Sequence, residues 1–245
     1  MRRIRKKPKF SGWLQQALRL MGCLPWLWVG YTLFVGVLLV VGKISLAFGI
    51  LASVTSLFVG VGLAKYTDLK VSSENPVGFY WAVNKSLPLA LLAAFAILFF
   101  WFLFMAIANV SSGEFYKIGQ FFFNWEFTPE NFNRRTLRET VSWIYSYANI
   151  ALIFVLLMLT TFGSWFSHPL MLFKEERWSD AKALGDQVSS KNLAEILKLQ
   201  GFIVFEAILC LSITPLLTPV LYVLVANLMY VSYKSFFEPA QEQES

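Results

Sequence analysis

Long uncharged runs alternate with short charged segments along the chain. A helix that crosses about 30 Å of hydrocarbon needs about 20 predominantly apolar residues. We therefore predict membrane-spanning helices at about residues 20–42, 44–64, 86–110, 144–166, 193–213 and 216–236. Only Gly42-Lys43 separates the first two, which indicates the tight turn of a helical hairpin. Pro215 and Pro219 divide the last apolar run into two helices, because proline disrupts a helix interior.

Three segments outside these spans have a distinct character. Residues 1–19 form a basic N-terminus, and residues 174–192 form an amphipathic segment on the same side of the membrane. Residues 111–139 form a loop on the opposite side of the membrane. Within the loop, Thr128-Pro129-Glu130 favours the start of a short helix at about 129–139, because threonine caps helices and proline suits their first position.

An aromatic residue and a mixed polar stretch precede three of the spans. Trp13, Phe79 and Trp178 each begin such a stretch, before the first, third and fifth predicted spans. Tryptophan and lysine at these positions are typical of amphipathic helices at the membrane–water interface. We therefore expect three repeated units, each an interfacial helix followed by a pair of spans.

The composition supports a membrane location. The chain of 245 residues is 57% apolar and 15% charged, with a mean hydropathy of +0.57, whereas soluble domains are about one quarter charged. The fold class that follows is all-α: one polytopic membrane helix bundle over residues 1–245. Cys23 and Cys210 are too few for a disulfide framework, and with His168 as the only histidine no metal site or other cofactor is expected.

The distribution of positive charge predicts the orientation. With both termini in the cytoplasm, sixteen of the 21 Lys and Arg residues fall on the inner side, in agreement with the positive-inside rule. Basic side chains next to a span contact anionic lipid headgroups, so nucleic acid is not expected as a partner. The residues assigned to this contact are Arg2, Arg3, Arg5, Lys6, Lys7 and Lys9.

The last third of the chain carries short motifs in a recognisable order. These are Ser167-His168-Pro169-Leu170-Met171-Leu172-Phe173, Trp178-Ser179-Asp180-Ala181, Lys191-Asn192-Leu193, Pro219 and Tyr233-Lys234-Ser235-Phe236-Phe237. The pattern resembles a group of uncharacterised bacterial six-helix inner-membrane proteins, related to the membrane region beside some glycerophosphodiester phosphodiesterases. The resemblance implies a six-helix topology in the bacterial inner membrane, and it implies no activity.

Glu206 is the acidic residue placed well inside a predicted span. An intramembrane carboxyl group is costly and marks a candidate functional site, and desolvation favours its neutral form. Asn227 lies at a similar depth on the next span, with Tyr222 nearer the turn, so we expect Glu206 and Asn227 to share a hydrogen bond inside the bundle. The group is either a proton or cation site, or a protonated acid that locks helices together or contacts a partner subunit, and its isolation favours the second interpretation.

Two further patterns have structural interpretations. Small residues at helical spacing let helix backbones approach closely, and here they form a packing stripe directed within the chain or toward another protein. The stripe consists of Ser45, Gly49, Ser53, Ser56, Gly60 and Ala64. Ser164 and His168 are spaced i, i+4, but no nucleophile-elbow motif surrounds the serine, so we interpret the pair as a chance interfacial arrangement.

The function predicted from these features is a non-catalytic one. Extensive apolar surface with few internal polar groups suits an integral membrane subunit, scaffold or assembly factor of a larger complex. Its expected partners are membrane lipids and other membrane subunits or further copies of the chain. The alternative is a small proton- or cation-coupled transporter or channel that uses Glu206. No catalytic residues are predicted.

Overall fold

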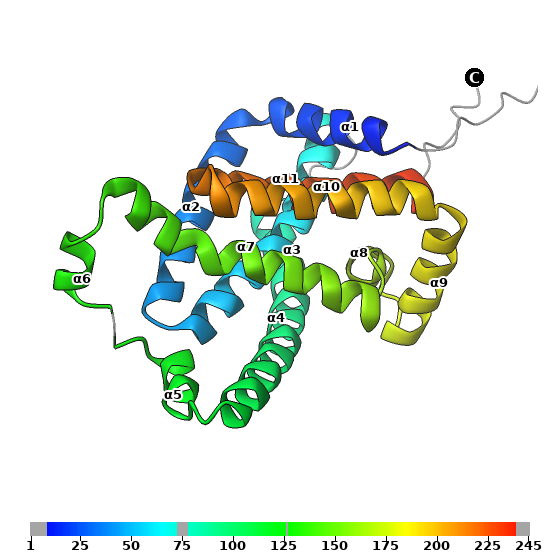
Figure 1. Ribbon diagram of the computed structural model, residues 1–245. Coiled ribbons are helices and arrows are strands. Elements are labelled where there is room, and N and C mark those ends of the chain that lie inside the picture. The colour runs from blue at the N-terminus through cyan, green and yellow to red at the C-terminus, as the bar shows by residue number, and fades with distance from the viewer. Residues whose placement is uncertain (1–8, 73–77, 126, 239–245) are drawn as a thin grey trace, which may run out of the picture.

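The computed structural model describes residues 9–72, 78–125 and 127–238, and its regular elements in these ranges are all helical (Figure 1). They comprise eleven α-helices, α1 to α11, and two 3₁₀ helices, η1 and η2. Five segments are long and apolar enough to cross a membrane: Pro25–Lys43, Leu46–Ser72, Phe79–Ser111, Leu137–Thr161 and Pro215–Phe237. The predicted all-α helical bundle is therefore confirmed.

The first span begins later than the hydropathy pattern predicts. Helix α1 (Phe10–Cys23) ends before Leu24, and α2 (Pro25–Val40) starts as a new helix. Proline has no N–H to donate to a preceding turn and is favoured at the first helical position, so the chain bends there. Residues 20–23 consequently belong to α1, which is the separate helix expected ahead of the first span.

A tight hairpin joins α2 to α3 (Leu46–Ser72) through η1 (Val41–Lys43), which confirms the predicted turn. Two glycines allow the close approach, since a Cβ atom on Gly49 would meet the Cα of Gly42 and the ring of Tyr147. The Tyr147 hydroxyl donates a hydrogen bond of 2.7 Å to the Leu39 carbonyl. The turn is thus held by an aromatic ring from a distant helix.

Helix α4 (Phe79–Ser111) runs without a break through Pro88, so the separate interfacial helix predicted before the third span is wrong. Its first turns pack on α3, where a Cβ on Gly62 would lie 2.8 Å from the side chain of Ser86. The Ser86 hydroxyl also donates to the Ala82 carbonyl at 2.7 Å. This close packing keeps the helix continuous despite the backbone hydrogen bond that proline removes.

The segment between α4 and the next long helix contains α5 (Tyr116–Phe122) and α6 (Pro129–Asn133). Helix α6 is shorter than the predicted 129–139, because α7 (Leu137–Thr161) begins there instead of near residue 144. Thr136 and Glu139 form a capping box, in which each side chain bonds the other's backbone N–H and satisfies donors that a helix start leaves free.

Two short helices lie beyond the other end of α7, namely α8 (Ser167–Lys174) and α9 (Trp178–Lys191). Helix α10 (Leu193–Ser212) then packs beside α7, and η2 (Pro215–Leu217) leads into α11 (Thr218–Phe237). Helix α10 is not among these five candidate spans, because it carries three charged residues, Glu195, Lys198 and Glu206. At about 1.5 Å per residue its 20 residues are nevertheless about 30 Å long, and the sixth span stays a prediction.

Helices α3 and α11 run in the same direction through the centre of the molecule. Gly60 lies against Ala226, and further along both helices Asp68 binds Lys234. More than seven-tenths of the apolar window of each of these two helices is buried, whereas in α4 the buried share is only 17%. Figure 1 shows α4 diverging from the rest of the bundle, which accounts for its exposure.

The beginning of α1 and the end of α11 lie at the same end of the molecule. The Trp13 indole N–H donates to the Ser235 hydroxyl at 3.0 Å, and the Phe10 backbone N–H donates to the Glu195 carboxylate at 2.7 Å. The start of α10 therefore lies beside the end of α11, and these two helices are antiparallel (Figure 1).

Candidate functional site

Glu206 occupies the flank of α10 and is half-buried, while the neighbouring Ile203 and Ala207 are fully buried against the bundle. Within the described ranges no hydrogen bond or ion pair reaches its carboxyl group. The carboxyl group thus lies at the edge of the bundle rather than within its polar interior.

Asn227 and Tyr222 are buried in α11 and have other partners. The Tyr222 hydroxyl donates to the Ala148 carbonyl at 2.6 Å, and the Asn227 amide donates to the Val223 carbonyl at 2.8 Å. The expected hydrogen bond between Glu206 and Asn227 is therefore not formed, because α10 turns its apolar residues rather than Glu206 toward the core. The Asn227 carbonyl oxygen is buried without a partner in the described part of the chain.

The small-residue stripe, which begins at Ser45 just before α3 and continues along that helix, packs inside the molecule. All six of its members, Ser45, Gly49, Ser53, Ser56, Gly60 and Ala64, are buried. A Cβ on Gly60 would lie 2.8 Å from the Cβ of Ala226 in α11, and the Tyr31 hydroxyl of α2 donates to the Ser56 carbonyl. Of the two directions that the sequence allowed for this stripe, the structure shows the one within the chain.

Most of the basic N-terminus lies outside the described residues, namely Arg2, Arg3, Arg5, Lys6 and Lys7. Lys9 is exposed and precedes the first turn of α1. Its contact with lipid headgroups stays a prediction.

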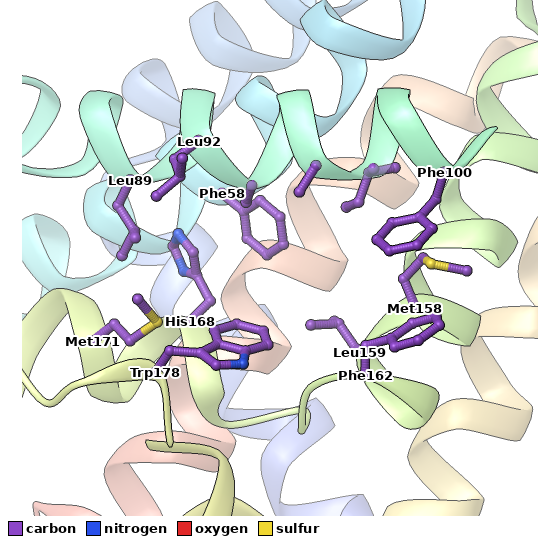
Figure 2. A pocket seen from close by; sticks show the side chains of 13 residues that line it. Phe58, Leu89, Leu92, Phe100, Met158, Leu159, Phe162, His168, Met171 and Trp178 are labelled. Carbon is purple, nitrogen blue, oxygen red and sulfur yellow. The ribbon is translucent and has the colours of Figure 1, made fainter. Parts of the chain in front are cut away.

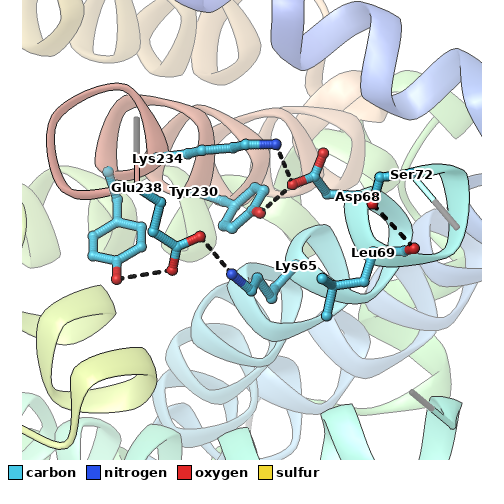
Figure 3. A network of polar contacts seen from close by, with 8 residues as sticks. Lys65, Asp68, Leu69, Ser72, Tyr230, Lys234 and Glu238 are labelled. Atoms are coloured by element: carbon cyan, nitrogen blue, oxygen red, sulfur yellow. Dashed lines mark hydrogen bonds and ion pairs between the residues drawn. The ribbon is translucent and has the colours of Figure 1, made fainter. Parts of the chain in front are cut away.

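A polar network joins the ends of α3 and α11 (Figure 3). The Asp68 carboxylate accepts hydrogen bonds from the Tyr230 hydroxyl and the Lys234 ammonium group. The Glu238 carboxylate accepts from the Tyr233 hydroxyl at 3.1 Å and pairs with Lys65. These contacts explain why α3 continues to Ser72, beyond the predicted end at residue 64, since the polar last turns of the helix have partners on α11.

An apolar pocket with a volume of about 240 Å³ lies between α4 and the segment from α7 to α9 (Figure 2). Apart from His168, its lining consists of aliphatic, methionine and aromatic side chains. They come from five helices: Phe58 from α3; Leu89, Leu92, Ala93, Ala96, Ile97 and Phe100 from α4; Met158, Leu159 and Phe162 around the end of α7; Met171 from α8; and Trp178 from α9. Leu92, Phe162 and Trp178 are each at least 46% exposed, so the pocket opens at the surface between α4 and α7.

His168 is the titratable residue of this lining, and it is only 4% exposed. Its ring stacks on Phe58 with a centroid distance of 4.1 Å, and neither ring nitrogen has a hydrogen-bond partner in the described part of the chain. Burial lowers the pKa of His168 to about 3, because low-dielectric surroundings disfavour the charged ring. The imidazole is therefore neutral at physiological pH, with one N–H donor and one acceptor nitrogen.

The structure does not join Ser164 and His168. The Ser164 hydroxyl instead accepts a weak hydrogen bond of 3.4 Å from the Phe166 backbone N–H. Among the described residues, no three His, Cys, Asp or Glu side chains gather in a way that could hold a metal ion.

Sequence reasoning overlooked the environment of His168. The residue lies in the run from Ser167 to Phe173, where its neighbours are Pro169, Leu170 and other apolar residues. A lone histidine in such a run was a signal for burial. Its lack of a hydrogen-bond partner among the described residues could not be inferred, because it depends on side chains from α3, α4 and α9.

Comparison of the chain with protein-family models, with curated proteins and with solved structures finds no match.

Proposed function

We propose that the protein is a non-catalytic integral membrane subunit or assembly factor of a larger membrane complex. In this proposal α10 is the sixth span, and both termini lie in the cytoplasm of a bacterial cell with the protein in its inner membrane. The observation that supports it best is the carboxyl group of Glu206, which has no partner within the described chain and lies on the flank of α10.

The cost of an unpaired carboxyl group favours a partner. An acidic residue at the centre of a membrane helix costs about 2.5–3.5 kcal/mol on insertion scales, and such residues usually pair. The exposed residues around it are apolar, among them Phe205 and Ile208. A polar side chain on another subunit, or on a second copy, would offset this cost, while the surrounding apolar residues pack against the same partner helix.

The exposed face of α4 suits a lipid-facing role. Its exposed large side chains between Leu87 and Val110 are all apolar, so hydrocarbon satisfies them without a protein partner. We therefore assign the specific contact to α10 and not to α4.

The transporter alternative receives less support from the geometry. A transport path normally presents several polar residues along one cavity. Glu206 lies on the flank of α10, whereas Asn227 and Tyr222 are buried with partners in α11 and α7. Glu206 does not line the apolar pocket.

The proposal is tested by the mass of the assembly in a gentle detergent. Wild-type protein is expected to elute with a stoichiometric partner or as an oligomer, and Glu206→Gln is expected to retain it because the amide still forms a hydrogen bond. Glu206→Leu removes an interhelical bond of about 0.6–2 kcal/mol, which weakens association by about three- to thirtyfold. Ile208→Leu, on the same exposed face, is the control and should not change assembly.

A wild-type protein that elutes as a lone monomer, with Glu206→Leu indistinguishable from it, would contradict the subunit proposal. A pH-dependent cation flux into proteoliposomes that Glu206→Gln abolishes would instead support the transporter.

A further inference from the structure

The first turns of α7 carry charged and hydroxyl side chains on one face. An open hollow of about 590 Å³ lies along this face. Side chains that are three or four residues apart share one side of a helix, so the members of its lining form a continuous polar surface. They include Arg135, Arg138, Glu139, Ser142, Trp143 and Ser146.

The hollow lies at the hairpin end of the bundle. The Lys43 ammonium group, in the turn between α2 and α3, is 4.8 Å from the centre of the Trp143 ring. Tryptophan is enriched where a membrane helix meets the lipid headgroups, and Arg138 belongs to the first turn of α7, five residues before Trp143. The hollow is therefore at the depth of the headgroups.

The arginines of this hollow have no acidic partner. All five ion pairs among the described residues involve lysine rather than arginine. Arg138 is exposed and has no hydrogen-bond partner in the described ranges. Uncharged groups fix Arg135, because its Nε donates to the Asn131 carbonyl at 3.2 Å and its Cζ is 4.5 Å from the centre of the Trp143 ring. Neither positive charge is neutralised by a carboxylate.

Glu139 is the acidic member of the lining, and its carboxylate is already engaged. Its Oε2 accepts hydrogen bonds of 2.8 Å from both the backbone N–H and the hydroxyl of Thr136. The lining thus carries two positive charges against one negative charge. An anion complements this charge, and the planar fork of arginine matches the oxygen atoms of a phosphate group.

Ser142 lies one helical turn deeper than Arg138, which is about 6 Å. Its side chain is half-buried, and no hydrogen bond in the described part of the chain reaches its hydroxyl. The Ser146 hydroxyl, by contrast, donates to the Trp143 carbonyl at 3.1 Å. An unpaired hydroxyl at membrane depth is unfavourable, and the glycerol and ester oxygens of a phospholipid lie just below its phosphate, where they would meet Ser142.

Still deeper along α7 the same face is apolar. Ile150 follows Ser146 by about one turn and Leu157 by about three, and both are exposed. From Arg138 to Ile150 the helix rises about 18 Å, whereas one leaflet is about 20–22 Å thick, half of a bilayer with its headgroups. The face therefore changes from charged to hydroxyl to apolar over the thickness of one leaflet, as a phospholipid does.

We propose that this face of α7 binds one anionic phospholipid. Arg135 and Arg138 bind its phosphate, and the Ser142 hydroxyl donates a hydrogen bond to a glycerol or ester oxygen. The acyl chains lie against Ile150 and Leu157, which a soluble phosphate compound would leave uncovered. The inference does not depend on the partner of α10, because Glu206 is not part of this face.

The test uses the full chain in detergent and native mass spectrometry, which resolves bound lipids. Phosphatidylglycerol is expected to bind at least about tenfold more tightly than phosphatidylcholine, whose choline group neutralises the phosphate. A phosphatidylglycerol with a diazirine in one acyl chain should label α7 between residues 146 and 157. Glycerol 3-phosphate, which lacks the chains, should bind far more weakly than the lipid.

Matched variants separate a defined site from general surface charge. Arg138→Gln should weaken binding of phosphatidylglycerol about tenfold or more, because it removes a charge-assisted hydrogen bond. Arg134→Gln removes the same charge from an exposed neighbour that does not line the hollow, and should change binding less than about twofold. Ser142→Ala should weaken binding about fivefold. Thermal unfolding shows that each variant is folded.

Equal weakening by Arg138→Gln and Arg134→Gln would overturn the proposal, as would equal binding of the two phospholipids or acyl labelling that is no stronger on α7 than on α4. Glycerol 3-phosphate that binds as tightly as the lipid would overturn the assignment to a lipid. Binding that Arg138→Gln weakens and Ser142→Ala leaves unchanged would overturn the assigned hydrogen bond.

Discussion

Replacing His168 by phenylalanine tests the central structural observation of the pocket directly. The variant keeps an aromatic ring stacked on Phe58 and removes two buried nitrogen atoms that have no partner in the described chain. An unpaired buried polar group costs about 1–3 kcal/mol, and an apolar group of similar shape does not incur this cost. In delipidated protein at pH 7 we therefore expect His168→Phe to raise the free energy of unfolding by about 1–3 kcal/mol.

The difference should grow as the pH falls. The pKa of His168 is lowered by burial from 6.5 to about 3, so between these values the unfolded chain binds a proton that the folded chain does not. The contribution of neutral His168 to the stability of wild type is therefore fully present above pH 6.5, the pKa in the unfolded chain. It decreases as the pH falls toward 3, the pKa in the folded chain. At 1.36 kcal/mol per unit, wild type loses about 2 kcal/mol between pH 6.5 and pH 5, and His168→Phe does not share this loss.

The assay is thermal unfolding in detergent at pH 7 and pH 5. A change of 1 kcal/mol corresponds to about 2–4 °C in Tm for a chain of 150–250 residues. Tyr222→Phe is the matched control, because it removes a buried hydroxyl that does have a partner, the Ala148 carbonyl. It should be less stable than wild type by about 1 kcal/mol, to the same extent at both pH values.

A lower Tm for His168→Phe with an unchanged pH dependence would refute the reasoning, because it would show that the His168 nitrogens are satisfied in the folded protein.

Two further substitutions test the packing and polar contacts of α3. Gly49→Ala should destabilise the protein by about 1–3 kcal/mol in the thermal unfolding assay, as overpacking does, because the added Cβ would meet Gly42 and Tyr147. Its control is Gly201→Ala, whose Cβ would have no neighbour within 4 Å. This control should be neutral or slightly stabilising in the same assay. Asp68→Asn weakens two charge-assisted hydrogen bonds and should lower the free energy of unfolding by about 1 kcal/mol, with faster amide exchange at the end of α3. The exposed Asp186→Asn is its control, and equal exchange in both would contradict the role of the network.

The hydropathy pattern predicts most of the helices because their cause is local. About 20 apolar residues in sequence are sufficient for a membrane-spanning helix, and the hairpin turn at Gly42-Lys43 follows from the short break between two such runs. The errors fall at the ends. Helix α3 extends to Ser72 because its last turns bind α11, and α4 is continuous through Pro88 because its first turns pack on α3.

The candidate site could be predicted only in part. The small residues of α3 indicate a close helix contact by their spacing alone, and the structure identifies Ala226 and Tyr31 as contacts of Gly60. The absence of a hydrogen bond between Glu206 and Asn227 could not be predicted, because the rotation of α10 about its axis decides whether Glu206 faces α11 or the flank.

The amino-acid sequence by itself determined that this chain forms apolar helices and where most of them lie, since the period and length of hydrophobic runs are properties of neighbouring residues. Only the tertiary structure decided which polar groups are satisfied. Among the residues that the structure describes, His168 has no hydrogen-bond partner, because side chains from α3, α4 and α9 surround it with hydrocarbon. Contacts between residues far apart in the chain arise from helix packing rather than from any local pattern.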